Sequence, residues 1–184
     1  MNSARPGLHR ISLRRLALCA AILSIASALP GQKENWKIYK YPADGFRVSF
    51  PADPKIEQNK KEAKSGSILM NSYCAQVSST FLCVAVIDQG PEATGLSPQT
   101  LLTRAKLGVL APPRTQKLNE LDIDLDGHKG IELETASDTE HVFTRIYLVD
   151  TTLYQTIVTL PPAGRYPDTS RFLDSFKLIP RVRY

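Results

Sequence analysis

The stretch VFTRIYLVDTTLYQTIVTL, residues 142–160, decides the fold class. Two alternating runs, 142–149 and 153–160, are separated by Asp150-Thr151-Thr152, which is typical of two strands joined by a turn. Successive side chains of a strand point to opposite faces, so each apolar residue can be assigned to a face. One face carries Ile146, Leu148 and Ile157, and the other carries Phe143, Tyr147, Val149, Val158 and Leu160. Because both faces are apolar, the sequence predicts a sheet that is covered on both sides.

Six further segments have the composition of strands. They are residues 36–41, 46–50, 68–77, 80–88, 118–125 and 129–134. Pro42-Ala43-Asp44-Gly45 is typical of a turn, so the first two segments are expected to form a hairpin. The whole chain therefore predicts about eight strands in hairpins.

Two helices are expected to cover this sheet. Ser97 is positioned to cap the first, Pro98 fits its first turn, and Pro112-Pro113 follows its end. Its buried stripe would consist of Leu101, Leu102, Ala105 and Val109. The second helix is expected to begin around Pro167-Asp168 and to bury Phe172, Leu173 and Phe176.

The first 28 residues have the pattern of a secretory signal peptide. Basic residues at Arg5, Arg10, Arg14 and Arg15 precede the apolar run 16–25, and Ala26-Ser27-Ala28 offers a cleavage site at Ala26 and Ala28. An uncleaved anchor is the alternative, but the apolar run is short for a membrane span. We expect residues 29–35 to be a short tether and 36–184 to be a single domain, exported to the periplasm or secreted.

The charge balance gives little reason to expect nucleic acid or an anionic membrane as partner. The whole chain has a formal net charge of +5, but four of its 23 basic residues and none of its 18 acidic ones precede Leu29. A chain cut there is close to neutral. Lys55, Lys60, Lys61 and Lys64 form a local basic cluster, for which we expect a solvated loop ending at Gly66. The alternative is a docking surface for an acidic partner at Lys60, Lys61 and Lys64.

Two cysteines are expected to form a disulfide. If Ser78-Ser79 is a two-residue loop, Cys74 lies directly opposite Cys83 in a non-hydrogen-bonded pair, where the strands are close enough for the bond. Export would favour oxidation. The alternative is two buried free thiols.

Asp122, Asp124, Asp126 and Gly127 match the opening of a calcium-binding loop, but the match then fails. The twelfth position, which should be a bidentate Glu, is Leu133, and Lys129 puts a positive charge into the site. We expect a strand here, joined to the next by the three-residue connection Asp126-Gly127-His128. No metal site is predicted.

No catalytic motif stands out in the chain. His128 and His141 are interpreted as turn or surface residues, and the sequence contains no Gly-x-Ser-x-Gly elbow and no phosphate-binding glycine loop. We predict no catalytic residues and no cofactor.

Three motifs resemble one known family. They are Tyr41-Pro42-x-Asp44-Gly45-Phe46-x-Val48-x-Phe50-Pro51-x-x-Pro54, Gly127-His128-x-Gly130-x-Glu132-Leu133, and residues 171–178, RFLDSFKL. They resemble exported bacterial PsbP-like proteins of the PsbP/MOG-type fold, over most of residues 36–179. The resemblance implies an α+β fold, an α/β/α sandwich with a bent, mostly antiparallel sheet between two main helices. It also implies a mostly non-enzymatic family and transfers no catalytic residue.

Three functions follow as hypotheses. The first is an extracytoplasmic binding or assembly-accessory domain that docks on a protein of the cell envelope through the rim of the sheet or residues 57–67. The second is a small-ligand carrier with a pocket between sheet and helix, near Tyr147, Tyr154 and Tyr166. The third is a hydrolase, which would need a polar cleft that holds His128 or His141 beside a serine or carboxylate.

Overall fold

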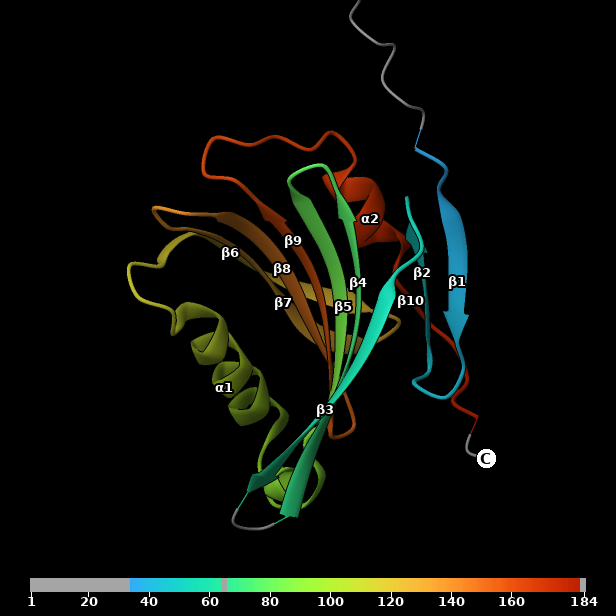
Figure 1. The fold of residues 1–184 in the computed structure, drawn as a ribbon. Helices are drawn as coiled ribbons and strands as arrows, with labels where there is room; N and C mark the ends of the chain where they lie inside the picture. Colours follow the sequence, from blue (N-terminus) through green and yellow to red (C-terminus); the bar gives the residue numbers. More distant parts are fainter. Residues whose placement is uncertain (1–33, 64–65, 183–184) are drawn as a thin grey trace, which may run out of the picture. The chain divides into compact units, whose positions relative to one another are not determined.

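The computed structural model describes residues 34–63 and 66–182 (Figure 1). The expected signal peptide, its cleavage site at Ala26 and Ala28, and Lys64 lie outside these ranges. Within them, ten strands form two sheets, accompanied by two α-helices and the short 3-10 helix Gly90–Ala93. None of these helices combines the length and the apolar content needed to cross a bilayer.

The larger sheet has seven strands in the order β3-β4-β5-β9-β8-β7-β6, and every neighbouring pair is antiparallel. Its strands are β3 (Lys55–Ala63), β4 (Gly66–Val77), β5 (Thr80–Asp88), β6 (Gln116–Leu125), β7 (His128–Ala136), β8 (His141–Val149) and β9 (Thr152–Leu160). The hairpin that decides the fold class, β8–β9, lies inside this sheet. The strands β3 and β6 are its two edges.

The first hairpin belongs to a separate small sheet. The strands β1 (Lys37–Tyr41), β2 (Phe46–Phe50) and β10 (Lys177–Leu178) pair in the order β1-β2-β10. Phe46, Val48 and Phe50 are fully buried because β2 turns alternate side chains onto the larger sheet. A hairpin with one strongly apolar face packs over a sheet better than it extends one, so the expected single sheet of about eight strands is wrong.

Both faces of the larger sheet are covered, as its two-sided pattern predicts. On one face, Leu101 and Leu102 of α1 (Pro98–Leu110) pack with Leu133 and Ile146. On the other face lie the small sheet and α2 (Thr169–Ser175), which buries Phe172 (Figure 1). A sandwich between two helices is therefore only half correct. A seven-residue helix is about 10 Å long and cannot cover seven strands spaced by about 5 Å, so β1–β2 supplies the rest of that layer.

The expected end signals of both helices are largely confirmed. The Ser97 side chain accepts a hydrogen bond from the Thr100 amide at 3.2 Å, and α1 ends before Pro112. The second helix begins at Thr169, slightly later than expected, with Asp168 before it.

One turn differs from its prediction. Leu125 pairs with His128, so the connection between β6 and β7 has two residues, Asp126 and Gly127, instead of three. Both have positive φ, 54° and 85°, as in a type I′ hairpin turn, whose backbone twist matches that of the flanking strands. A three-residue loop would place Ile123 and Leu125 on the same face as Ile131 and Leu133. In a sheet buried on both sides they do not need to share one, and Ile123 lies on the opposite face from Ile131.

The basic segment expected to be a solvated loop is largely the nine-residue strand β3. Its side chains are exposed from Lys55 to Lys60, so the segment lacks the apolar alternation by which strands are recognised. The hydrogen bonds to β4 define it as a strand instead.

Candidate functional site

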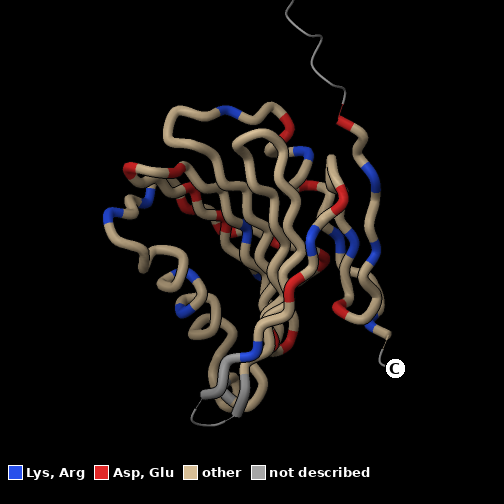
Figure 2. The backbone as a smooth tube through the Cα atoms, viewed as in Figure 1, with Lys and Arg blue, Asp and Glu red and all other residues tan. Residues whose placement is uncertain are grey.

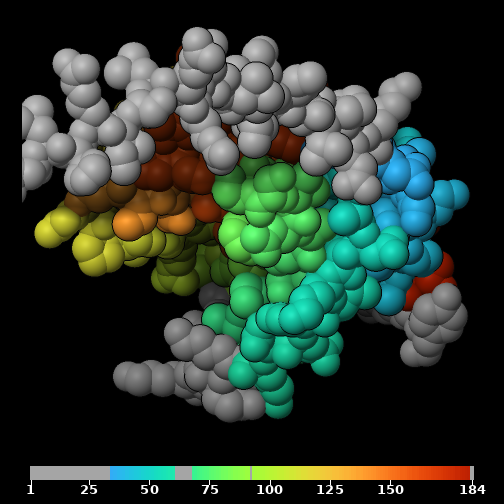
Figure 3. Space-filling view, turned by 45° about the horizontal axis from the view of Figure 1, so that its top comes forward, coloured from blue at the N-terminus to red at the C-terminus, as the bar shows by residue number. Residues whose placement is uncertain are grey.

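The strand β3 is the most exposed regular element in the described part of the larger sheet. Within the described residues it pairs only with β4, and Ile56 is 60% exposed. Figure 3 shows β3, in teal, as a surface ridge beside the green β4–β5 hairpin. The edge of a sheet presents backbone N–H and C=O groups that can pair with another chain. We call β3 and β4 together the arm.

The two edge strands of this sheet differ in charge. The edge strand β3 contains three lysines and two glutamates, and β6 contains one lysine and three acidic residues, whereas β4 and β9 contain none. Figure 2 marks the charged positions among the described residues. The β3 edge is therefore weakly basic and the β6 edge acidic. Of the predicted docking residues, Lys60 and Lys61 lie on β3, and Lys60 is exposed.

A polar network anchors the arm to the turn between β1 and β2. The Asn71 amide donates to both carboxylate oxygens of Asp44, at 3.1 and 3.0 Å, and accepts from Gln58 at 2.9 Å. The Tyr73 hydroxyl also donates to Asp44. Burial, with this carboxylate as a second cause, raises the pKa of Tyr73, so the hydroxyl stays protonated and the bond persists at neutral pH. The base of the arm is thus held in place.

A groove runs along the same part of the sheet, on the α1 side but beyond the reach of α1. The disulfide Cys74–Cys83 joins β4 to β5 there, with its Cα atoms 4.2 Å apart. The predicted pairing and register of these cysteines are confirmed. The groove has a volume of about 540 Å³ and is lined by Asp53, Lys55, Glu57, Gln76 and Phe81 as well as the cysteines. The Phe81 side chain is 46% exposed, so the groove offers apolar surface next to the β3 edge.

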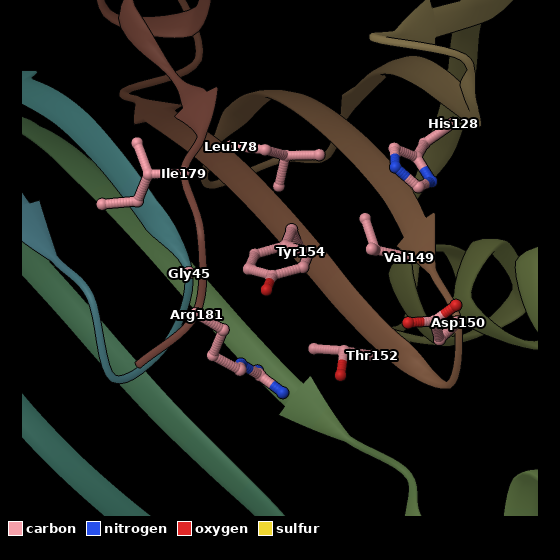
Figure 4. Close-up of a pocket in the computed structure, with 9 residues that line it drawn as sticks. All are labelled: Gly45, His128, Val149, Asp150, Thr152, Tyr154, Leu178, Ile179 and Arg181. Atoms are coloured by element: carbon pink, nitrogen blue, oxygen red, sulfur yellow. The ribbon is translucent and has the colours of Figure 1, made fainter. Parts of the chain in front are cut away.

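A second cavity, of about 410 Å³, lies between the far end of the β8–β9 hairpin and the C-terminal segment (Figure 4). Its polar lining includes His128, Asp150, Thr152, Tyr154 and Arg181. The Tyr154 hydroxyl donates to the Asp44 carbonyl at 2.7 Å. Burial raises the pKa of Tyr154, although Arg181 acts in the opposite direction, so this hydroxyl is a donor and not a base at neutral pH. No local motif marks this cavity, because its residues come from four separate segments of the chain.

The three tyrosines of the carrier hypothesis do not share a pocket. Tyr147 and Tyr154 are core residues, 5% and 3% exposed, and only Tyr154 borders the cavity of Figure 4. Tyr166 lines another cavity, beside His141, and donates to Glu34 at 2.7 Å.

The two histidines occupy different surroundings. His141 bonds through Nε2 to Glu134 Oε1 at 2.8 Å, and its ring lies 4.7 Å from the Phe143 ring at a tilt of 39°. Ser170 lines the same cavity, but among the described residues it has no hydrogen bond to His141. His128 borders the cavity of Figure 4 near Asp150, where the described lining contains no serine or cysteine. Neither arrangement forms an assembled nucleophile and base.

The aspartates that resemble a calcium loop serve the β6–β7 hairpin. Asp124 lies opposite Lys129 and accepts a hydrogen bond from the Gly127 amide at 2.8 Å. Among the described residues no group of three or more His, Cys, Asp or Glu is arranged to hold a metal ion.

Comparison with known proteins bears on the fold alone. No protein-family model matches this chain, and no curated protein matches it in sequence. The solution structure of cyanobacterial PsbP, CyanoP from Synechocystis sp. PCC 6803, matches with a TM-score of 0.50 over 84% of this chain and 98% of that chain, at 14% identity. The chain has a PsbP-like fold. A crystal structure of a Pseudomonas aeruginosa protein of unknown function aligns with a TM-score of 0.33 and 13% identity, over 70% of this chain and 84% of that chain.

Proposed function

We propose that this chain is a non-enzymatic, exported binding or assembly-accessory domain that docks on a protein of the bacterial cell envelope through the β3 edge and the adjacent groove. The observation that carries the proposal is the exposed edge strand, anchored at its base and bordered by apolar surface at Phe81. An extended segment of a partner could add a strand there, with backbone hydrogen bonds giving affinity and alternate side chains giving specificity.

Two further features support this proposal. The disulfide Cys74–Cys83 suits an oxidising compartment, as expected of an exported protein. The PsbP-like fold agrees with the family resemblance of the sequence, which implies a mostly non-enzymatic role.

Site-specific photocrosslinking in the native host tests the docking surface. A photoreactive residue at Gln58, on β3, should give a discrete covalent adduct in the envelope fraction. The same residue at Asp122, exposed on the opposite edge strand β6, is the matched control and should give none. If neither position gives an adduct, or if both give adducts in equal yield, docking at β3 is excluded.

The lysines of the docking hypothesis provide a second test. Changing Lys60 and Lys61 to Ser should reduce the Gln58 adduct if the partner is acidic. An unchanged yield would assign the contact to the backbone and to the groove.

A further inference from the structure

The backbone of β3 has a defined outward-facing set of groups. The Cα atoms of Cys74 and Cys83 are 4.2 Å apart, the spacing of a non-hydrogen-bonded pair, so the backbone of Cys74 faces β3. Cys74 lies opposite Lys55, and its backbone therefore bonds to Lys55. By alternation, the odd-numbered residues of β3 bond to β4. The N–H and C=O groups of Ile56 and Gln58 therefore point outward, away from the sheet.

A second copy that pairs antiparallel with β3 has few possible registers. Opposed residues must lie on the same face and must share the same hydrogen-bonding type, so odd residues oppose odd ones. Because β3 spans Lys55–Ala63, the register that uses the whole strand places Asn59 opposite Asn59 of the second copy.

The charges of β3 favour this same register. It places Glu57 of each copy opposite Lys61 of the other, which gives two opposite-charge pairs about a two-fold axis. Moving the axis to Gln58 would place Lys55 opposite Lys61, and moving it to Lys60 would place two Lys60 residues opposite each other. Opposite charges across a strand pair stabilise it and like charges destabilise it.

Charged residues on an edge strand commonly serve to prevent pairing. On β3 the charged residues destabilise the two neighbouring registers and stabilise the register with full overlap. The charge pattern therefore favours one pairing.

We propose that the occupant of the β3 edge is a second copy of this chain, paired antiparallel about Asn59, so that two seven-stranded sheets become one. This inference rests on the proposed function, since it names the partner at the same surface. Such an interface is isologous and closed, and it yields a dimer instead of a filament.

Charge exchange tests the register. The purified full chain should show a concentration-dependent dimer by sedimentation equilibrium. Glu57→Lys should weaken dimerisation by about tenfold or more, because it replaces two favourable pairs with two like-charge pairs. Lys61→Glu should do the same, and the double variant Glu57→Lys/Lys61→Glu should restore the dimer. Asp122→Lys makes the same charge change on β6 and should have no effect.

A cysteine at the axis tests the geometry. Asn59→Cys should form an intermolecular disulfide under mild oxidation, since a non-hydrogen-bonded pair brings the Cα atoms within bridging distance. Gln58→Cys is the control. In this register it lies opposite Lys60, and its own counterpart is too distant to be bridged.

The outcomes separate this inference from the proposed function. A Gln58 crosslink of twice the chain mass supports both. A crosslink to a different protein, with a chain that is monomeric at all concentrations, overturns the second-copy inference and leaves envelope docking standing. Dimerisation that does not respond to Glu57→Lys also overturns the inference. The absence of any Gln58 adduct contradicts the proposed function. In that case the intermolecular disulfide of Asn59→Cys would still show whether two copies pair at β3.

Discussion

The central hairpin β8–β9 and the arm β3–β4 are both antiparallel strand pairs of one sheet, yet the strands β9 and β3 have very different sequences. In β9 the fully buried Val158 and the nearly buried Leu153 and Leu160 recur, and neighbours cover both faces. In β3 every side chain from Lys55 to Lys60 is exposed. The comparison teaches that apolar alternation in a sequence identifies a strand whose face is covered by other elements. An uncovered edge strand with polar side chains lacks this pattern and is harder to recognise from sequence.

The largest expected difference in stability is between alanine substitutions of one isoleucine in each region. Ile146 in β8 is fully buried and Ile56 in β3 is 60% exposed. Ile146→Ala should lower the free energy of unfolding by about 2–5 kcal/mol, because it removes buried methyl groups and leaves a cavity. Ile56→Ala should change it by about 0.5 kcal/mol or less.

Urea denaturation of both variants provides the measurement. Comparable losses at the two positions would mean that β3 is covered in the folded chain, which would remove the contrast between the two regions.

The disulfide connects the arm to the interior of the sheet, from β4 to β5. Changing both Cys74 and Cys83 to Ala should lower the free energy of unfolding by about 2.5 kcal/mol, since the bond restricts a short loop in the unfolded chain. Thermal unfolding with and without reductant gives a second reading of the same quantity. If reduction shifts the midpoint of the double variant as much as that of the wild type, the effect has another source.

Asp44 holds the arm to the turn before β2. Asp44→Ala should lower the free energy of unfolding by about 1–3 kcal/mol, because Tyr73 and Asn71 lose their shared acceptor. Asp122→Ala, on exposed β6, is the matched control and should be close to neutral. Equal effects would show that the network does not stabilise the arm.

The smallest expected effect concerns Glu120 of β6, which bonds to Lys106 of α1 at 2.8 Å and also to Lys117. These two lysines hold the pKa of Glu120 below its usual range. Its ionised form therefore adds stability above its ordinary pKa of about 4.3, and this contribution is lost as the pH falls through the lowered value. Glu120→Gln should cost less than about 1 kcal/mol at neutral pH and nothing in strong acid. A difference that grows on acidification would contradict this assignment.

Sequence reasoning succeeded where side chains are buried or where local geometry is strict. Ile146 and Val158 indicated two covered faces, Ser97 and Pro98 gave the start of α1, and the Ser78-Ser79 turn placed Cys74 opposite Cys83. These features depend on local spacing.

The failures have a common physical origin in longer-range packing. The alternation of Phe46, Val48 and Phe50 shows that one face of the first hairpin is buried, but not that it packs on a sheet instead of joining one. Asp126-Gly127 is typical of a two-residue hairpin turn, and a loop length that puts the apolar residues of β6 and β7 on one face is wrong because both faces of this sheet are covered. The cavity of Figure 4 depends on where the C-terminal segment with Arg181 returns, which local spacing does not encode.

The most direct measurement of the central claim is amide hydrogen exchange along β3 at low and high protein concentration. The inward amides of Lys55, Glu57 and Asn59 bond to β4 and should be protected at both concentrations. The outward amides of Ile56 and Gln58 should exchange fast when the chain is dilute and become protected when it is concentrated, while exposed β6 stays unchanged. Outward amides that exchange equally fast at every concentration would contradict pairing of a second copy at this edge.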